Sequence, residues 1–146
     1  MSDSIVVGTD GSETAERALN EAIRLAKALD AEVHVVSAYE PLRGAKIQGA
    51  PEGAAKVWAP LPDTLVNTTV DQAVAKVRTS GLNVQAHAVD KDPADALLEV
   101  ANEVGASMII VGNKGMHGAR RVLGSVPNKV SHHANCNVLI VATNEN

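Results

Sequence analysis

Residues 107–125, SMIIVGNKGMHGARRVLGS, join an apolar run to a loop rich in glycine and basic residues. The four apolar residues from Met108 to Val111 are typical of a strand that is covered on both faces. Four glycines follow, namely Gly112, Gly115, Gly118 and Gly124. Glycines let backbone N–H groups approach an anion, and a helix that begins after such a loop adds partial positive charge. The stretch predicts a phosphate-binding loop, with a ligand-free glycine-rich turn as the alternative.

Short strand-like runs alternate with helical patterns along the chain. Apolar runs predict five strands, at Ser4–Gly8, Glu32–Ala38, Asn83–Val89, Ser107–Val111 and Asn137–Val141. Apolar residues at i, i+3, i+4 spacing predict helices over Ser12–Leu29, Thr64–Ser80, the segment between Asp92 and Gly105, and roughly Val122–His133. This alternation predicts a single α/β domain over residues 1–146, a doubly wound open parallel sheet with helices on both faces.

Polar residues mark the expected starts of three helices. Asp10 and Ser12 are both suited to cap the first helix, and the Asp92-Pro93 pair is suited to start the third. Ser125 carries a hydroxyl that is suited to cap the last helix. Asp10 follows the first strand directly, so its carboxylate is also a candidate for contact with a ligand; the two roles are compatible.

The loops after the first and fourth strands are expected to face each other. In a doubly wound sheet these strands are neighbours where the strand order reverses, and ligands bind outside the strand ends at that point. The loop at residues 8–12 would then lie across a crevice from the glycine-rich loop, which predicts a nucleotide site. The chain has no GxxxxGK[ST] pattern and no GxGxxG after its first strand, so the P-loop and dinucleotide-binding classes are excluded.

Composition narrows the class of protein further. The chain is 45% hydrophobic with no Phe, one Trp and one Tyr, so its core must be aliphatic. A net charge of −4 argues against a nucleic-acid partner. The single cysteine, Cys136, fits a reducing compartment, and the sequence shows neither a signal peptide nor a membrane-spanning run. We therefore expect a cytoplasmic protein that does not interact with a membrane.

Other features leave two interpretations open or favour an ordinary role. The proline- and glycine-bearing connection at residues 40–62 is either a lid over the crevice or a solvated loop.

The histidines of the predicted strands, His34 and His87, are expected to form ordinary hydrogen bonds, and no metal site is expected. Because no Ser-His-Asp group or carboxylate pair marks a catalytic centre, we do not expect an enzyme, with a slow ATPase as the alternative.

Over essentially its full length, the chain resembles the universal stress protein family. The resemblance rests on the opening SIVVGTDGSETAERALNEAIRLAKALDAEVHVVSAYEP and the closing IIVGNKGMHGARRVLGSVPNKVSHHANCNVLIV. ATP-binding members of that family carry a G-x2-G-x9-G-S/T motif, which is similar to Gly112-x2-Gly115-x8-Gly124-Ser125 here. The resemblance implies a strand order of 3-2-1-4-5 and a homodimer joined along the strand Asn137–Val141.

The resemblance also implies an adenine-nucleotide site, with ATP or cyclic AMP as ligand and Mg²⁺ possible alongside ATP. The candidate nucleotide-binding residues are Gly8, Thr9, Asp10, Ala38, Val111, Gly112, Lys114, Gly115, Met116, His117, Gly118, Gly124, Ser125 and Val126. By similarity, the first three line the adenine and ribose pocket, and the backbone near Ala38 meets the adenine. The residues at the end of the fourth strand, with Gly115, meet the ribose and first phosphate, and the last three hold phosphate oxygens.

The glycine motif is one residue shorter than the family's pattern, which bears on the choice of nucleotide. A shorter loop leaves less room for the β- and γ-phosphates, so AMP or cyclic AMP is expected to bind as well as or better than ATP. The expected function is a regulatory sensor or sink of adenine nucleotides. A ligand-free dimeric stress protein, or one with chaperone-like activity, is the further alternative.

Overall fold

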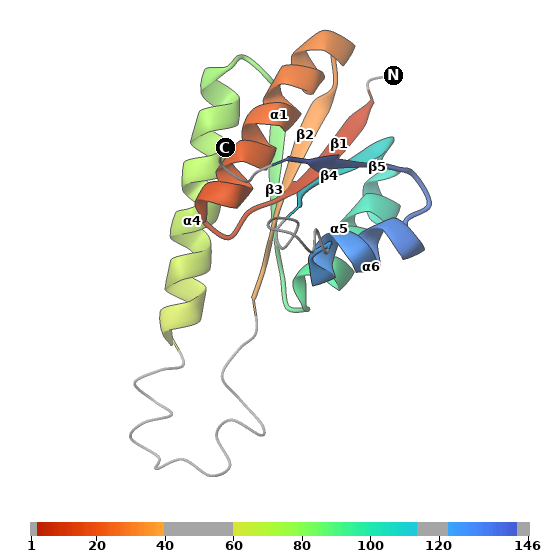
Figure 1. Cartoon of the computed structure of the whole chain (residues 1–146). Coiled ribbons are helices and arrows are strands. Elements are labelled where there is room, and N and C mark those ends of the chain that lie inside the picture. The colour runs from red at the N-terminus through yellow and green to blue at the C-terminus, as the bar shows by residue number, and fades with distance from the viewer. Residues whose placement is uncertain (1–2, 40–59, 114–122, 143–146) are drawn as a thin grey trace.

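The computed structural model describes residues 3–39, 60–113 and 123–142, with the backbone alone for residues 60–67. Figure 1 shows a sheet with helices on both sides. Its strands are β1 (Ser4–Gly8), β2 (Glu32–Ala38), β3 (Val84–Val89), β4 (Met108–Gly112) and β5 (Asn137–Val141). All neighbouring strands are parallel, in the order β3-β2-β1-β4-β5. The predicted doubly wound fold and its strand order are confirmed.

Strand β1 lies at the centre of the sheet, between β2 and β4. Its residues pair in register with β2 from Ser4↔Glu32 to Gly8↔Val36, and Val7 also pairs with Ile110 of β4. The chain reverses its direction of winding between β1 and β4. The loops that leave these two strands therefore start side by side, at the carboxyl ends of the strands.

The core has two layers, one on each face of the sheet. Helices α1 (Glu13–Leu29) and α4 (Pro60–Thr79) cover one face, and α5 (Pro93–Val104) and α6 (Ser125–His133) cover the other (Figure 1). Ile5 and Val7 belong to the first layer, whereas Val6 belongs to the second, because successive strand side chains point to opposite faces. All three are fully buried. Both layers are aliphatic, as the composition predicts.

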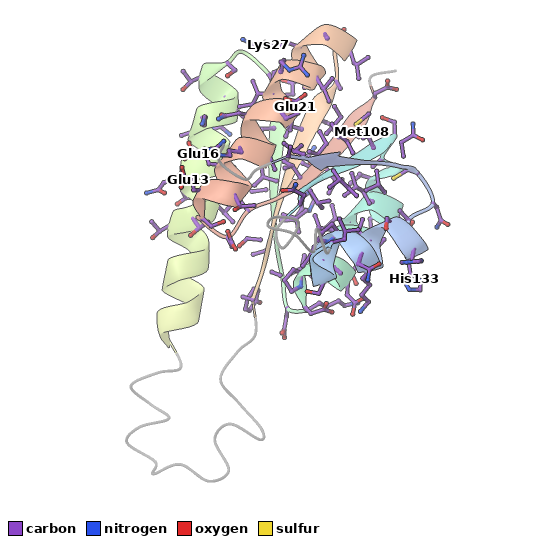
Figure 2. The ribbon with its side chains drawn as sticks, viewed as in Figure 1. Glu13, Glu16, Glu21, Lys27, Met108 and His133 are labelled. Atoms are coloured by element: carbon purple, nitrogen blue, oxygen red, sulfur yellow. The ribbon has the colours of Figure 1, made fainter. Side chains whose placement is uncertain are left out.

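Helix α1 presents an apolar face to the sheet and a charged face to solvent. Its buried residues are Ala18, Leu19, Ala22, Ile23 and Ala26. Figure 2 shows Glu13, Glu16, Glu21 and Lys27 along the same helix. The apolar spacing also predicts that Leu29 faces the core, but this side chain is 47% exposed, since the helix ends there at Asp30 in the left-handed conformation.

Two predicted helix starts are wrong. Helix α4 begins at Pro60, four residues before the predicted start, because prolines in a first turn lack only N–H groups that have no helical acceptor. Its first residues, 60–62, therefore do not belong to the connection, and residues 40–59 lie outside the described part of the chain. Helix α6 begins at Ser125 rather than near Val122. None of the helices in the described part of the chain has the length and apolar character of a membrane span.

Candidate functional site

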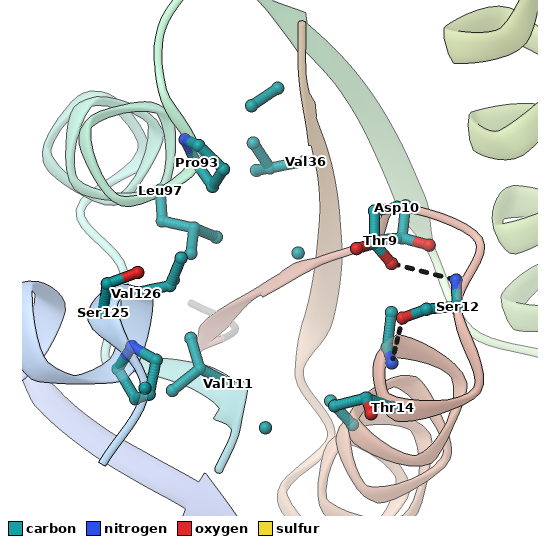
Figure 3. Close-up of a pocket in the computed structure, with 17 residues that line it drawn as sticks. Thr9, Asp10, Ser12, Thr14, Val36, Pro93, Leu97, Val111, Ser125 and Val126 are labelled. Atoms are coloured by element: carbon teal, nitrogen blue, oxygen red, sulfur yellow. Dashed lines mark hydrogen bonds between the residues drawn. The ribbon is translucent and has the colours of Figure 1, made fainter. Parts of the chain in front are cut away.

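A cavity of about 500 Å³ opens at the edge of the sheet where β1 and β4 end (Figure 3). Its walls come from β1, β2, β4 and the N-terminal parts of α1, α5 and α6. The lining residues are Gly8, Thr9, Asp10, Ser12, Thr14, Ala15, Ala18, Val36, Ala38, Pro93, Leu97, Val111, Gly112, Gly124, Ser125, Val126 and Pro127. Its volume is within the range of small-molecule sites.

The loop between β1 and α1 is folded by hydrogen bonds from its own side chains. The Ser12 N–H donates to Asp10 Oδ1 at 2.9 Å (Figure 3), and the Gly11 N–H donates to Thr9 Oγ1 at 3.3 Å. Ser12 is the N-cap of α1, since its Oγ accepts from the Ala15 N–H at 3.1 Å. The φ of Gly11 is +81°, a conformation that favours glycine at this turn. Of the two predicted caps, Ser12 therefore fills the role and Asp10 shapes the turn.

One side of the cavity is apolar. Val36 and Ala38 project from the same face of β2, two residues apart, and Leu97 and Pro93 come from α5. Gly8 lies opposite Leu97: a Cβ at position 8 would come within 3.3 Å of Leu97 Cδ2. The absence of a side chain at Gly8 thus leaves the space between β1 and α5 open.

The N-terminus of α6 forms the part of the cavity wall next to α5. Gly124 is its N-cap, so the prediction that Ser125 caps this helix is wrong; Ser125 is the first helical residue. The N–H groups of Ser125 and Val126 lack intrahelical acceptors because they lie in the first turn. Pro127 has no N–H, and the Asn128 N–H donates to the Gly124 carbonyl at 3.0 Å. The first turn therefore presents few backbone donors, together with the positive end of the helix dipole.

An ion-pair cluster joins the starts of α5 and α6 beside the cavity. Lys129 Nζ of α6 lies 2.9 Å from Asp95 Oδ1 and 3.8 Å from Asp92 Oδ1. Asp92 is at the N-cap position of α5 as predicted, but it makes no side-chain capping hydrogen bond. Its pKa is raised, chiefly by its side-chain hydrogen bond to Asp95, whereas the pKa of Asp95 is lowered by that bond and by Lys129.

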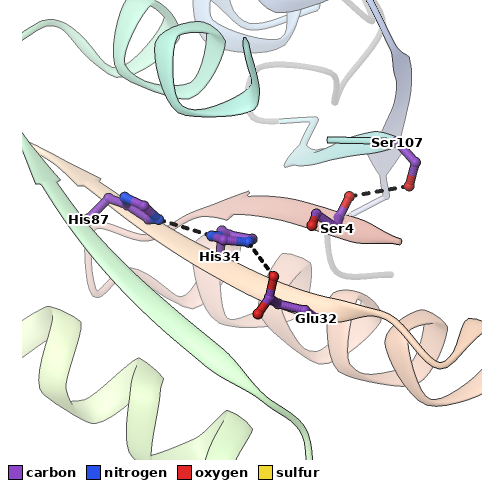
Figure 4. Close-up of polar contacts among 5 residues, drawn as sticks. All are labelled: Ser4, Glu32, His34, His87 and Ser107. Carbon is purple, nitrogen blue, oxygen red and sulfur yellow. Dashed lines mark hydrogen bonds and ion pairs between the residues drawn. The ribbon is translucent and has the colours of Figure 1, made fainter. Parts of the chain in front are cut away.

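The strand histidines, which do not line the cavity, form a partly buried chain of hydrogen bonds with Glu32 (Figure 4). His34 Nδ1 lies 3.0 Å from His87 Nε2, and His34 Nε2 lies 3.1 Å from Glu32 Oε1. A carboxylate only accepts, so we assign the proton of neutral His34 to Nε2, and Nδ1 then accepts from His87. The expectation of ordinary hydrogen bonds is confirmed. Within the described ranges, no group of three or more His, Cys, Asp or Glu side chains is arranged to hold a metal ion.

The sequence model of the Universal stress protein family matches residues 1–142. The chain belongs to the universal stress protein family. The universal stress protein Rv1636 of Mycobacterium tuberculosis (strain ATCC 25618 / H37Rv) is 37% identical, over 96% of either chain. The universal stress protein MJ0531 of Methanocaldococcus jannaschii is 31% identical, over 94% of this chain and 80% of that relative.

Solved structures of other universal stress proteins share this fold. One, a universal stress protein in complex with cAMP, is 32% identical with a TM-score of 0.73, over 98% of both chains. Another, the universal stress protein from Archaeoglobus fulgidus in complex with dAMP, is 25% identical with a TM-score of 0.66, over 96% of this chain and 97% of that one.

In this universal stress protein, nine of the fourteen predicted site residues line the cavity. They are Gly8, Thr9, Asp10, Ala38, Val111, Gly112, Gly124, Ser125 and Val126. The other five, Lys114, Gly115, Met116, His117 and Gly118, lie outside the described residues. That these residues bind a nucleotide stays a prediction.

The sequence reasoning missed much of the apolar wall. Val36 shares a strand face with Ala38, so the period of two could have found it. For Leu97, the only signal in the sequence is the apolar spacing of α5. This spacing predicts a core residue, but not one that also borders a cavity. Pro93 and Pro127 were recognisable as helix-start residues, yet the wall that they form depends on how the helices pack.

Proposed function

We propose that this chain binds an adenine nucleotide in the cavity between β1 and β4 and acts as a regulatory sensor or sink. The observation that carries the proposal is the joining, in one cavity of about 500 Å³, of an apolar slot, a polar turn and a helix N-terminus. The related structures with cAMP and dAMP support it, since both ligands contain adenine and one phosphate.

Each part of the cavity matches one part of a nucleotide. The apolar slot between Val36, Ala38 and Leu97 suits the flat base. The Thr9 hydroxyl and the Asp10 carboxylate, at the end of β1, suit the ribose hydroxyls. The N–H groups at the start of α6 suit the phosphate, because a helix N-terminus attracts anions.

The described lining favours a ligand of low charge. Asp10 is the only ionisable side chain among the described residues that line the cavity, and it is acidic. Pro127 withholds a donor from the first turn of α6, and the nearby Lys129 is paired with Asp95. We therefore propose that cAMP, with one charge, and AMP bind at least as well as ATP. The glycine motif, one residue short of the family pattern, supports the same preference.

Calorimetric titration of the full chain with cAMP, AMP and ATP, each with and without Mg²⁺, tests this proposal. We expect heat of binding for all three, with cAMP or AMP at least as tight as ATP. ATP binding that is roughly tenfold tighter, about 1.4 kcal/mol, would overturn the preference. The absence of binding by all three would overturn nucleotide binding itself.

A pair of matched variants locates the binding in the cavity. Ala38→Leu adds a larger side chain to the apolar slot, whereas Ala88→Leu makes the same change at an exposed position of β3 that does not line it. We expect the first variant to lose most of its nucleotide affinity and the second to keep it. Equal affinities in the two variants would place the nucleotide elsewhere.

We propose binding rather than catalysis as the activity, with slow ATP hydrolysis as the competing function. The turn at residues 8–12 holds one carboxylate, Asp10, and a single carboxylate is weak evidence for ATP hydrolysis. Phosphate release from ATP, measured alongside an Asp10→Ala variant, separates the two. Release at background rates in both proteins agrees with a binding protein; release that Asp10→Ala abolishes identifies an ATPase.

We also propose that the chain forms a homodimer along β5. This strand is at the edge of the sheet, and its four apolar residues from Val138 to Val141 are only half-buried. An apolar edge strand is a template for pairing with another chain. Sedimentation equilibrium should give twice the chain mass, and Ile140→Lys should reduce it, whereas Gln85→Lys on the opposite edge should not. A single-chain mass at all concentrations contradicts the proposal.

A further inference from the structure

The position of α6 decides where its N-terminal donors lie in the cavity. This helix has nine residues, of which Pro127 and Val130 are the buried ones. It packs more extensively on α5 than on β4 or β5, and the two helices lie side by side in Figure 1. Its N-cap, Gly124, has no side chain to hold the first turn. The described contacts that hold α6 in place are therefore largely contacts with α5.

The Lys129–Asp95 ion pair spans these two helices beside the cavity. Asp95 is in the first turn of α5, two residues after Pro93, and Lys129 is four residues after Ser125. Pro93 and Ser125 both line the cavity. The 2.9 Å contact thus ties together the two helix starts that form adjacent parts of its wall.

The two carboxylates near Lys129 are not equivalent. Asp95 Oδ1 is within hydrogen-bond distance of Lys129 Nζ, whereas Asp92 Oδ1 is 3.8 Å away. The pKa of Asp95 is lowered, first by its hydrogen bond with Asp92 and then by Lys129, and the pKa of Asp92 is raised by its neighbour Asp95. The connection between the helices therefore runs mainly through Asp95.

We propose that the Lys129–Asp95 ion pair positions the N-terminus of α6 against α5 and thereby sets the affinity for the phosphate of the bound nucleotide. This inference rests on the proposed nucleotide function. Lys129 is in this view a positioning residue: its ammonium group is held by Asp95, and it acts through the backbone donors of Ser125 and Val126. In the proposed pose the base lies against β2 and α5 and the ribose lies at the end of β1, whereas only the phosphate contacts α6. A displacement of α6 is therefore expected to change the affinity for the phosphate.

Titrations with AMP and with adenosine, which differ by one phosphate, test the inference. We expect Lys129→Met and Asp95→Asn each to weaken AMP binding by roughly threefold to fivefold, the scale of a half-exposed ion pair, while adenosine affinity is unchanged. The double variant should be no weaker than either single one, because both changes remove the same contact. Lys129→Arg should restore most of the AMP affinity.

Two control variants match these changes. Asp92→Asn neutralises the second carboxylate near Lys129, the one that lies 3.8 Å away. This change should alter AMP affinity by less than about twofold. Lys76→Met removes the ion pair with Glu16, at 2.6 Å, which joins α4 to α1 on the other face of the sheet, and should leave both affinities unchanged.

Several outcomes would overturn the inference. Unchanged AMP affinity in Lys129→Met would remove the role of the ion pair. A loss of AMP affinity in Lys129→Met, together with a gain in Asp95→Asn, would mean that Lys129 contacts phosphate directly. Equal losses for AMP and adenosine would indicate a general change in the fold. Failure of the wild-type chain to bind either compound would instead contradict the proposed function.

Discussion

A single methyl group at position 8 would enter the space between β1 and α5. Gly8 is at the end of β1, and a Cβ there would lie 3.3 Å from Leu97 Cδ2, a contact tight enough that Leu97 must move. Leu97 is almost fully buried, so its movement would narrow the apolar slot. We expect Gly8→Ala to weaken AMP binding by roughly tenfold, about 1.4 kcal/mol, because the methyl group and the displaced Leu97 side chain take up space that the base would fill. Calorimetric titration measures this loss.

A second change at the same contact provides the control for Gly8→Ala. Leu97→Val shortens the side chain that meets the new methyl group. The double variant Gly8→Ala/Leu97→Val should therefore recover much of the AMP affinity. If the double variant binds AMP no better than Gly8→Ala alone, the contact with Leu97 does not limit the space for the base.

Among the helices, the starts of α1 and α6 offer a direct comparison of two serines. Ser12 caps α1 through its hydroxyl, whereas Ser125 follows the N-cap Gly124 and makes no cap of its own. We expect Ser12→Ala to lower the free energy of unfolding by about 1 kcal/mol, and Ser125→Ala to change it by less than about 0.5 kcal/mol. Denaturant unfolding at one protein concentration, without ligand, measures both. Equal losses would place the cap of α6 at Ser125 after all.

The contact between β2 and β3 predicts a dependence of stability on pH. Burial, and then the neighbouring His34, lower the pKa of His87, while Glu103 acts in the opposite direction. The unfolded chain, with the ordinary pKa near 6.5, then binds more protons than the folded chain at mildly acid pH. The contribution of His87 to the free energy of unfolding is therefore fully present above about pH 6.5. It decreases as the pH falls below this value, until the pH reaches the lowered pKa of His87 in the folded state.

The variant His87→Gln tests this origin of the acid sensitivity. Glutamine retains a donor for His34 Nδ1 but does not titrate. Between pH 7 and pH 5, the wild-type chain should lose more free energy of unfolding than the variant. Parallel losses in the two proteins would assign the pH dependence to other groups.

The accuracy of the sequence predictions differs between strands and helix ends. The bounds of β1, β2 and β5 match the prediction, because Val and Ile runs bounded by polar residues leave little choice. Helix starts were less accurate, since Pro60 and Gly124 were compatible with a loop as well as with a first turn. The cavity was predicted through the ends of β1 and β4, but its α5 wall depends on packing that local patterns do not encode.

For the molecule as a whole, nucleotide binding and unfolding are linked. A ligand that binds only the folded chain raises the free energy of unfolding by about 2.7 kcal/mol at one hundred times its Kd. For a chain of this size, that corresponds to an increase in Tm of roughly 5–10 °C. Thermal unfolding at increasing AMP concentration should show this rise, and Ala38→Leu should abolish it. A Tm that is independent of AMP would contradict binding to the folded state.

The central place of β1 also bears on how the chain is made. The ribosome releases β1 first, and its neighbour β2 follows soon afterwards. Its other neighbour, β4, arrives much later: Ser4 and Ser107, which meet across β1 and β4 in Figure 4, are 103 residues apart. During most of synthesis β1 therefore has an unpaired edge, with the apolar residues Ile5, Val6 and Val7 at its centre. Only the last third of the polypeptide supplies the strand that pairs with this edge.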